Sequence, residues 1–171
     1  MRGAKGSVII ISAVFTMLLV QSVFARLLAP YPFAPYLGLP FVFALGTAPG
    51  VGILRGAASA FAIGYLYDLF TGNPLGIHTF VFVIGLLTAR LIGYLVPFRG
   101  VVFELVLTFL LTLPLGGLLE TIRAFTPGGM AWDGLTLTLA LFGSAFATAL
   151  VAPPLFALTR WIDPQAEGVP T

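Results

Sequence analysis

The sequence has no cysteine, a single histidine and very few charged residues. The absence of cysteine argues against disulfides, thiolate metal sites and thiol catalysis. Charged residues make up only 8% of the chain and hydrophobic residues 59%, with a mean hydropathy of +1.08, so polar side chains cannot cover a water-soluble globule. The composition therefore predicts an all-α integral membrane protein with one domain, residues 1–171, and room for at most about six transmembrane helices.

The arrangements of polar residues that catalysis requires are also missing. The chain has no Gly-x-Ser-x-Gly elbow, no cluster of histidines and carboxylates, and no phosphate-binding loop. Its basic residues are scattered at the ends of apolar runs, where membrane topology explains them. We therefore predict a non-enzymatic protein with no catalytic residue, no cofactor, no metal and no nucleic-acid partner.

Apolar runs separated by proline, glycine and charge divide the chain into six predicted spans. The first run has the alternative of a cleaved signal peptide, with Val23 and Ala25 at the cleavage site, but its apolar stretch continues further and favours a retained span. The second run contains Pro40 and is short, so it can be kinked, tilted or only partly crossing. The predicted spans are residues 7–28, 36–47, 51–70, 74–96, 101–125 and 134–161.

The distribution of lysine and arginine predicts the orientation of these spans. Cytoplasmic loops carry an excess of these residues, and a cytoplasmic N-terminus gives one consistent assignment. Both termini are then cytoplasmic, and the outer side holds only Arg26 and Arg123. The inner side holds Arg2, Lys5, Arg55, Arg90, Arg99 and Arg160.

A polar stretch from Asp68 to His78 lies between two apolar runs and predicts a tight helical hairpin. Gly72 suits the left-handed residue that ends one helix, Asn73 suits the cap of the next, and Pro74 suits its first position. Almost no linker then remains, and the Asp68 and His78 side chains, each about one turn inside its helix, can face each other and form a hydrogen bond. The alternative is an interfacial turn whose polar residues contact lipid headgroups.

Small residues recur at every fourth position in the span before this hairpin. In lipid, small residues at this spacing let helix backbones approach closely, although glycine and alanine are also simply frequent in membrane helices. The next span repeats the pattern with Gly85, Ala89 and Gly93, so we predict that the two helices pack closely. We predict that the first stripe is a close-packed interface, either within the bundle or against a partner span. It consists of Gly52, Gly56, Ala60 and Gly64.

Two acidic residues in the fifth span complete the set of polar candidates. Glu120 and Arg123 are three residues apart on one helix face, so they can form an ion pair. Glu104 lies near the start of the same span, and Pro114 is expected to kink it.

The segment from Phe43 to His78 resembles the core of the MreD family, small rod-shape-determining membrane proteins of bacteria. The resemblance rests on Phe43–Gly46, Gly52–Gly64 and above all Tyr67–His78, which contains the family pattern of an aspartate, a Thr-Gly and a Pro-Leu-Gly-apolar-His. Gly76 is the glycine of that last motif. The chain departs from the family at Pro35-Tyr36, where an acidic residue is often found.

The resemblance implies a subunit of the bacterial cell-elongation machinery in the cytoplasmic (inner) membrane. Such a subunit binds the bitopic protein MreC and, through it, connects to the MreB filament, to the glycosyltransferase RodA and to a penicillin-binding transpeptidase. It supports peptidoglycan synthesis and the maintenance of cell shape. The implied fold is similar to the six-helix substrate-binding subunits of energy-coupling-factor transporters. This kinship leaves an alternative function, the binding of a small vitamin-like molecule as a transporter subunit.

Overall fold

The computed structural model describes residues 35–71, 74–96, 100–125 and 133–162, together with Ser12, Phe15, Thr16, Leu18 and Leu19 of the first predicted span. All elements in this part of the chain are α-helices, which agrees with the predicted all-α class. They are α2 (Gly38–Thr47), α3 (Ile53–Thr71), α4 (Ile77–Leu95), α5 (Val101–Ala124) and α6 (Gly134–Ile162).

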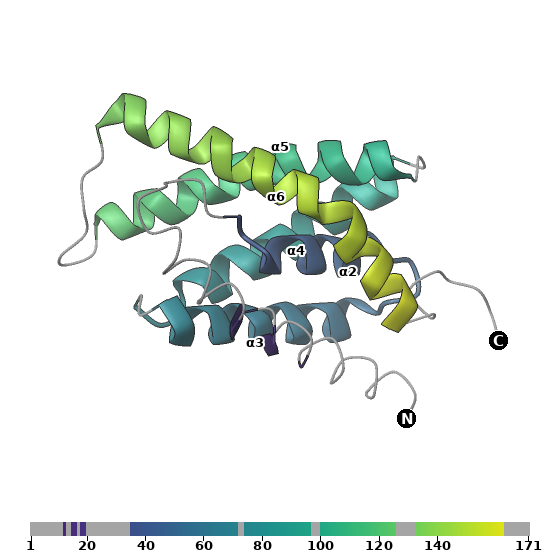
Figure 1. Cartoon of the computed structure of the whole chain (residues 1–171). Coiled ribbons are helices and arrows are strands. Elements are labelled where there is room, and N and C mark those ends of the chain that lie inside the picture. The colour runs from purple at the N-terminus through teal and green to yellow at the C-terminus, as the bar shows by residue number, and fades with distance from the viewer. Residues whose placement is uncertain are drawn as a thin grey trace.

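The short helix α2 lies at the centre of the bundle. Figure 1 shows α2 beside α4, with α3 on one side of them and the α5–α6 pair on the other. Every residue of α2 from Gly38 to Gly46 is buried. Ten helical residues extend only about 15 Å, half of a hydrocarbon core of about 30 Å. The second predicted span is therefore a helix, but one that serves as the core around which longer helices pack.

Three of the described helices have the length and composition to cross a membrane, namely α4, α5 and α6. Helix α3 is as long as α4, but Arg55 and Asp68 lower its mean hydropathy. Large apolar side chains are exposed on the outside of the bundle, among them Leu54 and Leu91. Exposed apolar surface on several helices is typical of a protein that contacts lipid or partner helices. The membrane class is thus supported, while the count of six spans stays a prediction.

The small-residue stripe of α3 packs against α4 over most of its length. A Cβ atom added at Gly64 would lie 2.5 Å from Thr79 Cα, and one added at Gly56 would lie 3.2 Å from Leu86 Cδ1. Ala60, between them, is fully buried. Gly52 precedes α3, and an added Cβ there would have no atom within 4 Å, so it makes no close contact within the described bundle, and its packing against a partner span stays a prediction. The close approach therefore starts only at Gly56, inside the helix.

The predicted close packing of α3 on α4 is confirmed, but the glycine and alanine stripe of α4 itself faces α2 and α5. A Cβ added at Gly93 would meet Thr47 of α2, and one added at Gly85 would meet Leu115 of α5 and Phe43 of α2. From the other side, a Cβ at Gly46 would lie 2.7 Å from the Leu86 carbonyl oxygen. Helix α4 thus uses one face for α3 and another for α2, because as a central helix it must pack on both sides (Figure 1).

An ion pair between a buried glutamate and an exposed arginine joins the first turn of α5 to the last turn of α6. The Arg160 guanidinium donates a hydrogen bond to Glu104 Oε1, and Glu104 is 3% exposed. A carboxylate in a first turn and a cation in a last turn are both favoured by the helix dipole. The two residues are 56 positions apart, and the sequence alone gave no reason to pair them.

Candidate functional site

The Asp68 carboxylate, near the end of α3, caps the N-terminus of α4. Its Oδ1 accepts hydrogen bonds from the His78 N–H and from His78 Nδ1, both at 2.9 Å. Its Oδ2 accepts from the N–H groups of Gly76 and Thr79 and from Thr79 Oγ1. The first N–H groups of a helix have no partner within it, and their positive partial charge favours an anion. A carboxylate that is 1% exposed is stabilised here by the start of the helix that follows it.

The capping differs from the sequence prediction in its details. Pro74 does not occupy the first helical position, because α4 begins at Ile77. The link between α3 and α4 is longer than predicted and spans residues 72–76. The left-handed residue in the described part of this link is Gly76, with φ of 105°, a conformation that favours glycine. The predicted roles of Gly72 and Asn73 lie outside the described residues.

The predicted contact between Asp68 and His78 is confirmed, and it determines the protonation of the ring. An ionised carboxylate only accepts hydrogen bonds, so His78 Nδ1 carries a proton. His78 Nε2 lies 3.4 Å from Nη2 of Arg123, which can only donate. The arrangement therefore assigns a neutral imidazole that donates to Asp68 and accepts from Arg123. His78 itself is 1% exposed.

Arg123 extends this network from α4 to α5. Its Nη1 donates to Glu120 Oε1 at 2.6 Å, which confirms the predicted ion pair. Its position in the last turn of α5 also suits the negative end of the helix dipole. The network thus runs from the Asp68 carboxylate through the His78 imidazole and the Arg123 guanidinium to the Glu120 carboxylate. At each contact a hydrogen-bond donor faces an acceptor.

Two further hydrogen bonds at this end of the bundle fix the start of α2. The Gly38 N–H donates to the Tyr67 hydroxyl at 2.8 Å, and a Cβ at Gly38 would lie 2.5 Å from the Tyr67 ring. The Tyr36 N–H donates to Thr148 Oγ1 of α6 at 2.9 Å. The Tyr67 ring also contacts the rings of His78 and Phe82, with centroids 5.5 and 5.0 Å away. Residues from α2 to α6 are therefore joined around the Asp68 motif.

The arrangement resembles the acid–histidine pair of a catalytic site, but both nitrogens of the imidazole face protein groups. In acid–base catalysis the far nitrogen of the imidazole must reach a substrate or nucleophile. Here that nitrogen faces the Arg123 guanidinium, and the ring is packed against Tyr67 and Phe82. Among the described residues no group of three or more histidines, cysteines or carboxylates could hold a metal ion. The site can fix the relative positions of α3, α4 and α5. We refer to Asp68, His78, Thr79, Glu120 and Arg123 as the Asp68 network.

Several contacts of this site were not predicted from the sequence. Thr79 is the third residue of α4, and its position directly after His78 could have indicated the contact, because the N–H of the third helical residue often meets a capping oxygen. The contact of Arg123 with His78 spans 45 positions and had no such signal. The same is true of Tyr67 and Gly38, which meet only because α2 lies inside the bundle.

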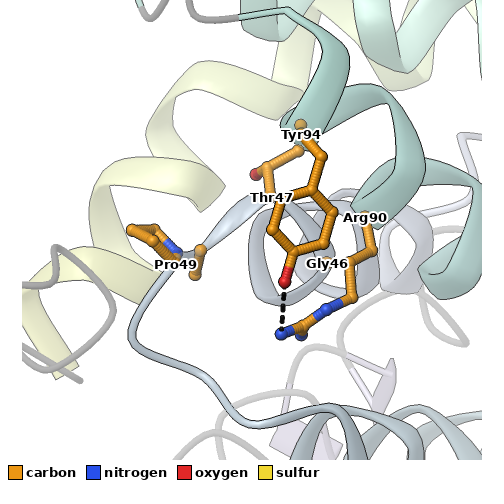
Figure 2. Close-up of a pocket in the computed structure, with 7 residues that line it drawn as sticks. Gly46, Thr47, Pro49, Arg90 and Tyr94 are labelled. Carbon is orange, nitrogen blue, oxygen red and sulfur yellow. Dashed lines mark hydrogen bonds between the residues drawn. The ribbon is translucent and has the colours of Figure 1, made fainter.

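A cavity of about 80 Å³ opens at the opposite end of the bundle, where α2 and α4 end. Figure 2 shows Tyr94 and Arg90 of α4 on one side of it and Pro49, from the loop after α2, on the other. Arg90 Nη1 donates to the Val51 carbonyl at 2.8 Å, and Nη2 donates to the Tyr94 hydroxyl at 3.3 Å. The lining residues are Gly46, Thr47, Ala48, Pro49, Arg90, Gly93 and Tyr94.

Comparisons of this chain with family models, with curated proteins and with solved structures gave no match.

Proposed function

We propose that this protein is a non-enzymatic membrane scaffold of the bacterial cell-elongation complex, and that it binds an MreC-type bitopic partner through the outer faces of its helices. The proposal draws on the resemblance of residues 67–78 to the MreD motif. It draws also on the hydrogen bonds that the Asp68 and His78 side chains of this motif form inside the bundle.

The observation that carries the proposal is that the polar atoms of the motif are engaged inside the protein. The Asp68 carboxylate accepts five hydrogen bonds, all from α4 or from the residue before it. His78 lies between Asp68 and Arg123. A group held in this way positions helices and does not contact a substrate. What the bundle offers to other molecules is its exposed apolar surface.

Two exposed faces are suited to partner helices. On α3, Phe61 and Tyr65 are 57% and 42% exposed and stack with parallel rings, while Gly56, Ala60 and Gly64 of the same helix pack against α4. On α6, Phe146 is 60% exposed. Aromatic side chains are enriched in protein interfaces because they bury a large area with little loss of conformational freedom.

The proposal includes six spans with both termini in the cytoplasm of a bacterium. In this topology the Asp68 network lies at the outer surface of the inner membrane, and the Arg90 cavity lies at the cytoplasmic surface. The fold kinship with the energy-coupling-factor subunits belongs to the same proposal. Through the MreC-type partner the protein would connect to MreB, RodA and the transpeptidase.

The alternative of a vitamin-like ligand draws no support from the Arg90 cavity. Pockets that bury a small organic ligand usually measure about 300–1,000 Å³. The cavity at Arg90 is about 80 Å³. It suits a small polar group and not a vitamin.

The test is capture of the partner by the full-length protein. A tagged MreC-type protein is co-expressed with this chain, the membranes are solubilised in mild detergent, and the complex is isolated without added nucleotide or cofactor. We expect a stable complex. Phe61→Ala and Phe146→Ala remove similarly exposed rings from α3 and α6. The variant that weakens capture identifies the helix that contacts the partner, and the other variant is its matched control. Failure to capture the partner, together with tight binding of a vitamin-like molecule, would favour the transporter alternative.

A further inference from the structure

The cavity at the ends of α2 and α4 has the features of a site for an anionic group. Arg90 is half-buried at its edge, and its guanidinium is held in place by two hydrogen bonds, to the Val51 carbonyl and to the Tyr94 hydroxyl. A guanidinium carries five N–H donors, so further donors remain for another group. Because the Tyr94 hydroxyl accepts a hydrogen bond from Arg90, the proton of that hydroxyl points away from Arg90 and can be donated to another group. In Figure 2 both groups lie at the same side of the cavity, facing the loop that contains Pro49.

The charge around the cavity is positive. None of the residues that line it is acidic, and Arg55 lies at the same end of the bundle. The ends of α2 and α4 contribute a negative partial charge, about half a unit each for a whole helix terminus. Some carbonyls at these ends already accept hydrogen bonds, because Thr47 Oγ1 donates to the Ala44 carbonyl and the Val96 N–H donates to the Ile92 carbonyl. The Arg90 guanidinium is the only charged side chain among the residues that line the cavity.

The level of the cavity along the bundle matches the headgroup region of a membrane. Tyr94 and Trp161, at the ends of α4 and α6, are 74% and 80% exposed. Exposed tyrosine and tryptophan at helix ends mark the interface between hydrocarbon and water. Arg90 lies one helical turn before Tyr94, about 6 Å deeper along the axis, from where a long cationic side chain reaches the same level.

We propose that this cavity binds the phosphate of an anionic phospholipid, with Arg90 and the Tyr94 hydroxyl as donors. A cavity of about 80 Å³ has room for a small polar group such as one phosphate. The guanidinium fork matches two phosphate oxygens. The acyl chains extend along the exposed apolar surface beside the cavity, where Leu91 and Leu95 are 60% and 72% exposed. This site is at the other end of the molecule from the Asp68 network and does not depend on the scaffold function.

The test measures lipid retention by the purified full-length protein. The protein in detergent receives an equimolar mixture of phosphatidylglycerol and phosphatidylcholine, and native mass spectrometry counts the lipids that stay bound. We expect preferential retention of phosphatidylglycerol, and a loss of at least about tenfold in its apparent affinity in Arg90→Gln, since a hydrogen-bonded charge contact is removed. Arg55→Gln is the matched control, because it removes the same charge at the same end of the bundle outside the cavity lining. It should change retention by less than about twofold.

Two further variants keep the proposal testable if Arg90→Gln folds poorly through loss of its bond to Val51. Tyr94→Phe removes only one hydroxyl and should weaken retention by about two- to tenfold. Arg90→Lys keeps the charge but not the fork, and should fall between the wild type and Arg90→Gln. Equal retention of the two lipids, or equal effects of Arg90→Gln and Arg55→Gln, would overturn the site. Inorganic phosphate at millimolar concentration is the last control. If it displaces the lipid and, without lipid, stabilises the protein against unfolding as much as the lipid does, free phosphate is the ligand and the lipid assignment is overturned.

Discussion

Replacement of Gly64 by alanine should destabilise the protein, although alanine is normally the better helix former. An added Cβ would lie 2.5 Å from Thr79 Cα, 2.8 Å from Thr79 N and 2.9 Å from the His78 carbonyl oxygen. Carbon atoms in contact prefer about 3.5–4.0 Å, so the shortfall is about 1 Å against backbone atoms that no rotamer change can move. Helix α3 must therefore shift away from α4.

Two costs follow from this shift, and one gain opposes them. Overpacking of a core costs about 1–3 kcal/mol. The Thr79 N–H and hydroxyl both bind the Asp68 carboxylate, and hydrogen bonds to charged groups contribute about 1.5–3 kcal/mol each. Alanine gains up to about 1 kcal/mol over glycine in a helix interior. We expect a net loss of about 2 kcal/mol or more in the free energy of unfolding.

The measurement is unfolding of the purified protein by SDS in mixed micelles, followed by circular dichroism. Gly117→Ala is the matched control, because Gly117 is also inside a helix but has no atom within 4 Å of an added Cβ. It should be neutral or stabilising by up to about 1 kcal/mol. If Gly64→Ala is as stable as Gly117→Ala, the close contact between α3 and α4 is not as described, and the packing role of the stripe fails.

Three other predictions use the same protein. A cysteine introduced at Gly72 into this cysteine-free chain should react with a membrane-impermeant maleimide from the outer side only, and labelling from the cytoplasmic side alone would reverse the topology. Tyr67→Phe should lower the SDS unfolding free energy by about 1–3 kcal/mol, because the buried Gly38 N–H loses its acceptor, and an unchanged value would show that this bond contributes nothing. Arg160→Gln should destabilise the protein because the buried Glu104 carboxylate loses its charged partner, by less than the roughly 3–5 kcal/mol of a fully buried pair, since the Arg160 side chain is 42% exposed. Adding Glu104→Gln should recover part of that loss, and no recovery in the double variant would argue against the pair.

The sequence predicted those parts of the site that depend on helical spacing. Glu120 and Arg123 were placed together because residues three apart on a helix are neighbours, and they form an ion pair at 2.6 Å. Gly56, Ala60 and Gly64 are four residues apart and share the face of α3 that packs against α4, whereas Gly52 precedes α3 and makes no such contact. The contact between Asp68 and His78 was predicted and is observed at 2.9 Å, but the count of turns behind it was wrong, because His78 is the second residue of α4 and does not lie one turn inside it.

What could not be predicted depends on tertiary contacts. Local turn chemistry favoured Asn73 and Pro74 as the start of the next helix, but a carboxylate from the preceding helix supplies the cap, and α4 begins at Ile77. Propensities describe the local chain, whereas Asp68 is brought to this helix end by the packing of Gly64 against Thr79. The central position of α2 could not be predicted either, because it depends on contacts with the other helices. From sequence alone, a short apolar segment with Pro40 resembles a kinked or partly crossing transmembrane span.

The most direct test of the Asp68 network as a structural clamp is a double-mutant cycle between Asp68 and His78. Asp68→Asn, His78→Ala and the double variant are compared with the wild type by SDS unfolding, and the fraction of folded, monodisperse protein is measured in parallel. We expect non-additive losses with a coupling of about 0.5–3 kcal/mol, because each single variant already removes or weakens the hydrogen bond between the Asp68 carboxylate and the His78 ring. We also expect partner capture per folded molecule to stay unchanged. Strictly additive losses, or single variants that fold normally but no longer capture the partner, would contradict the clamp and give the motif a direct role in binding.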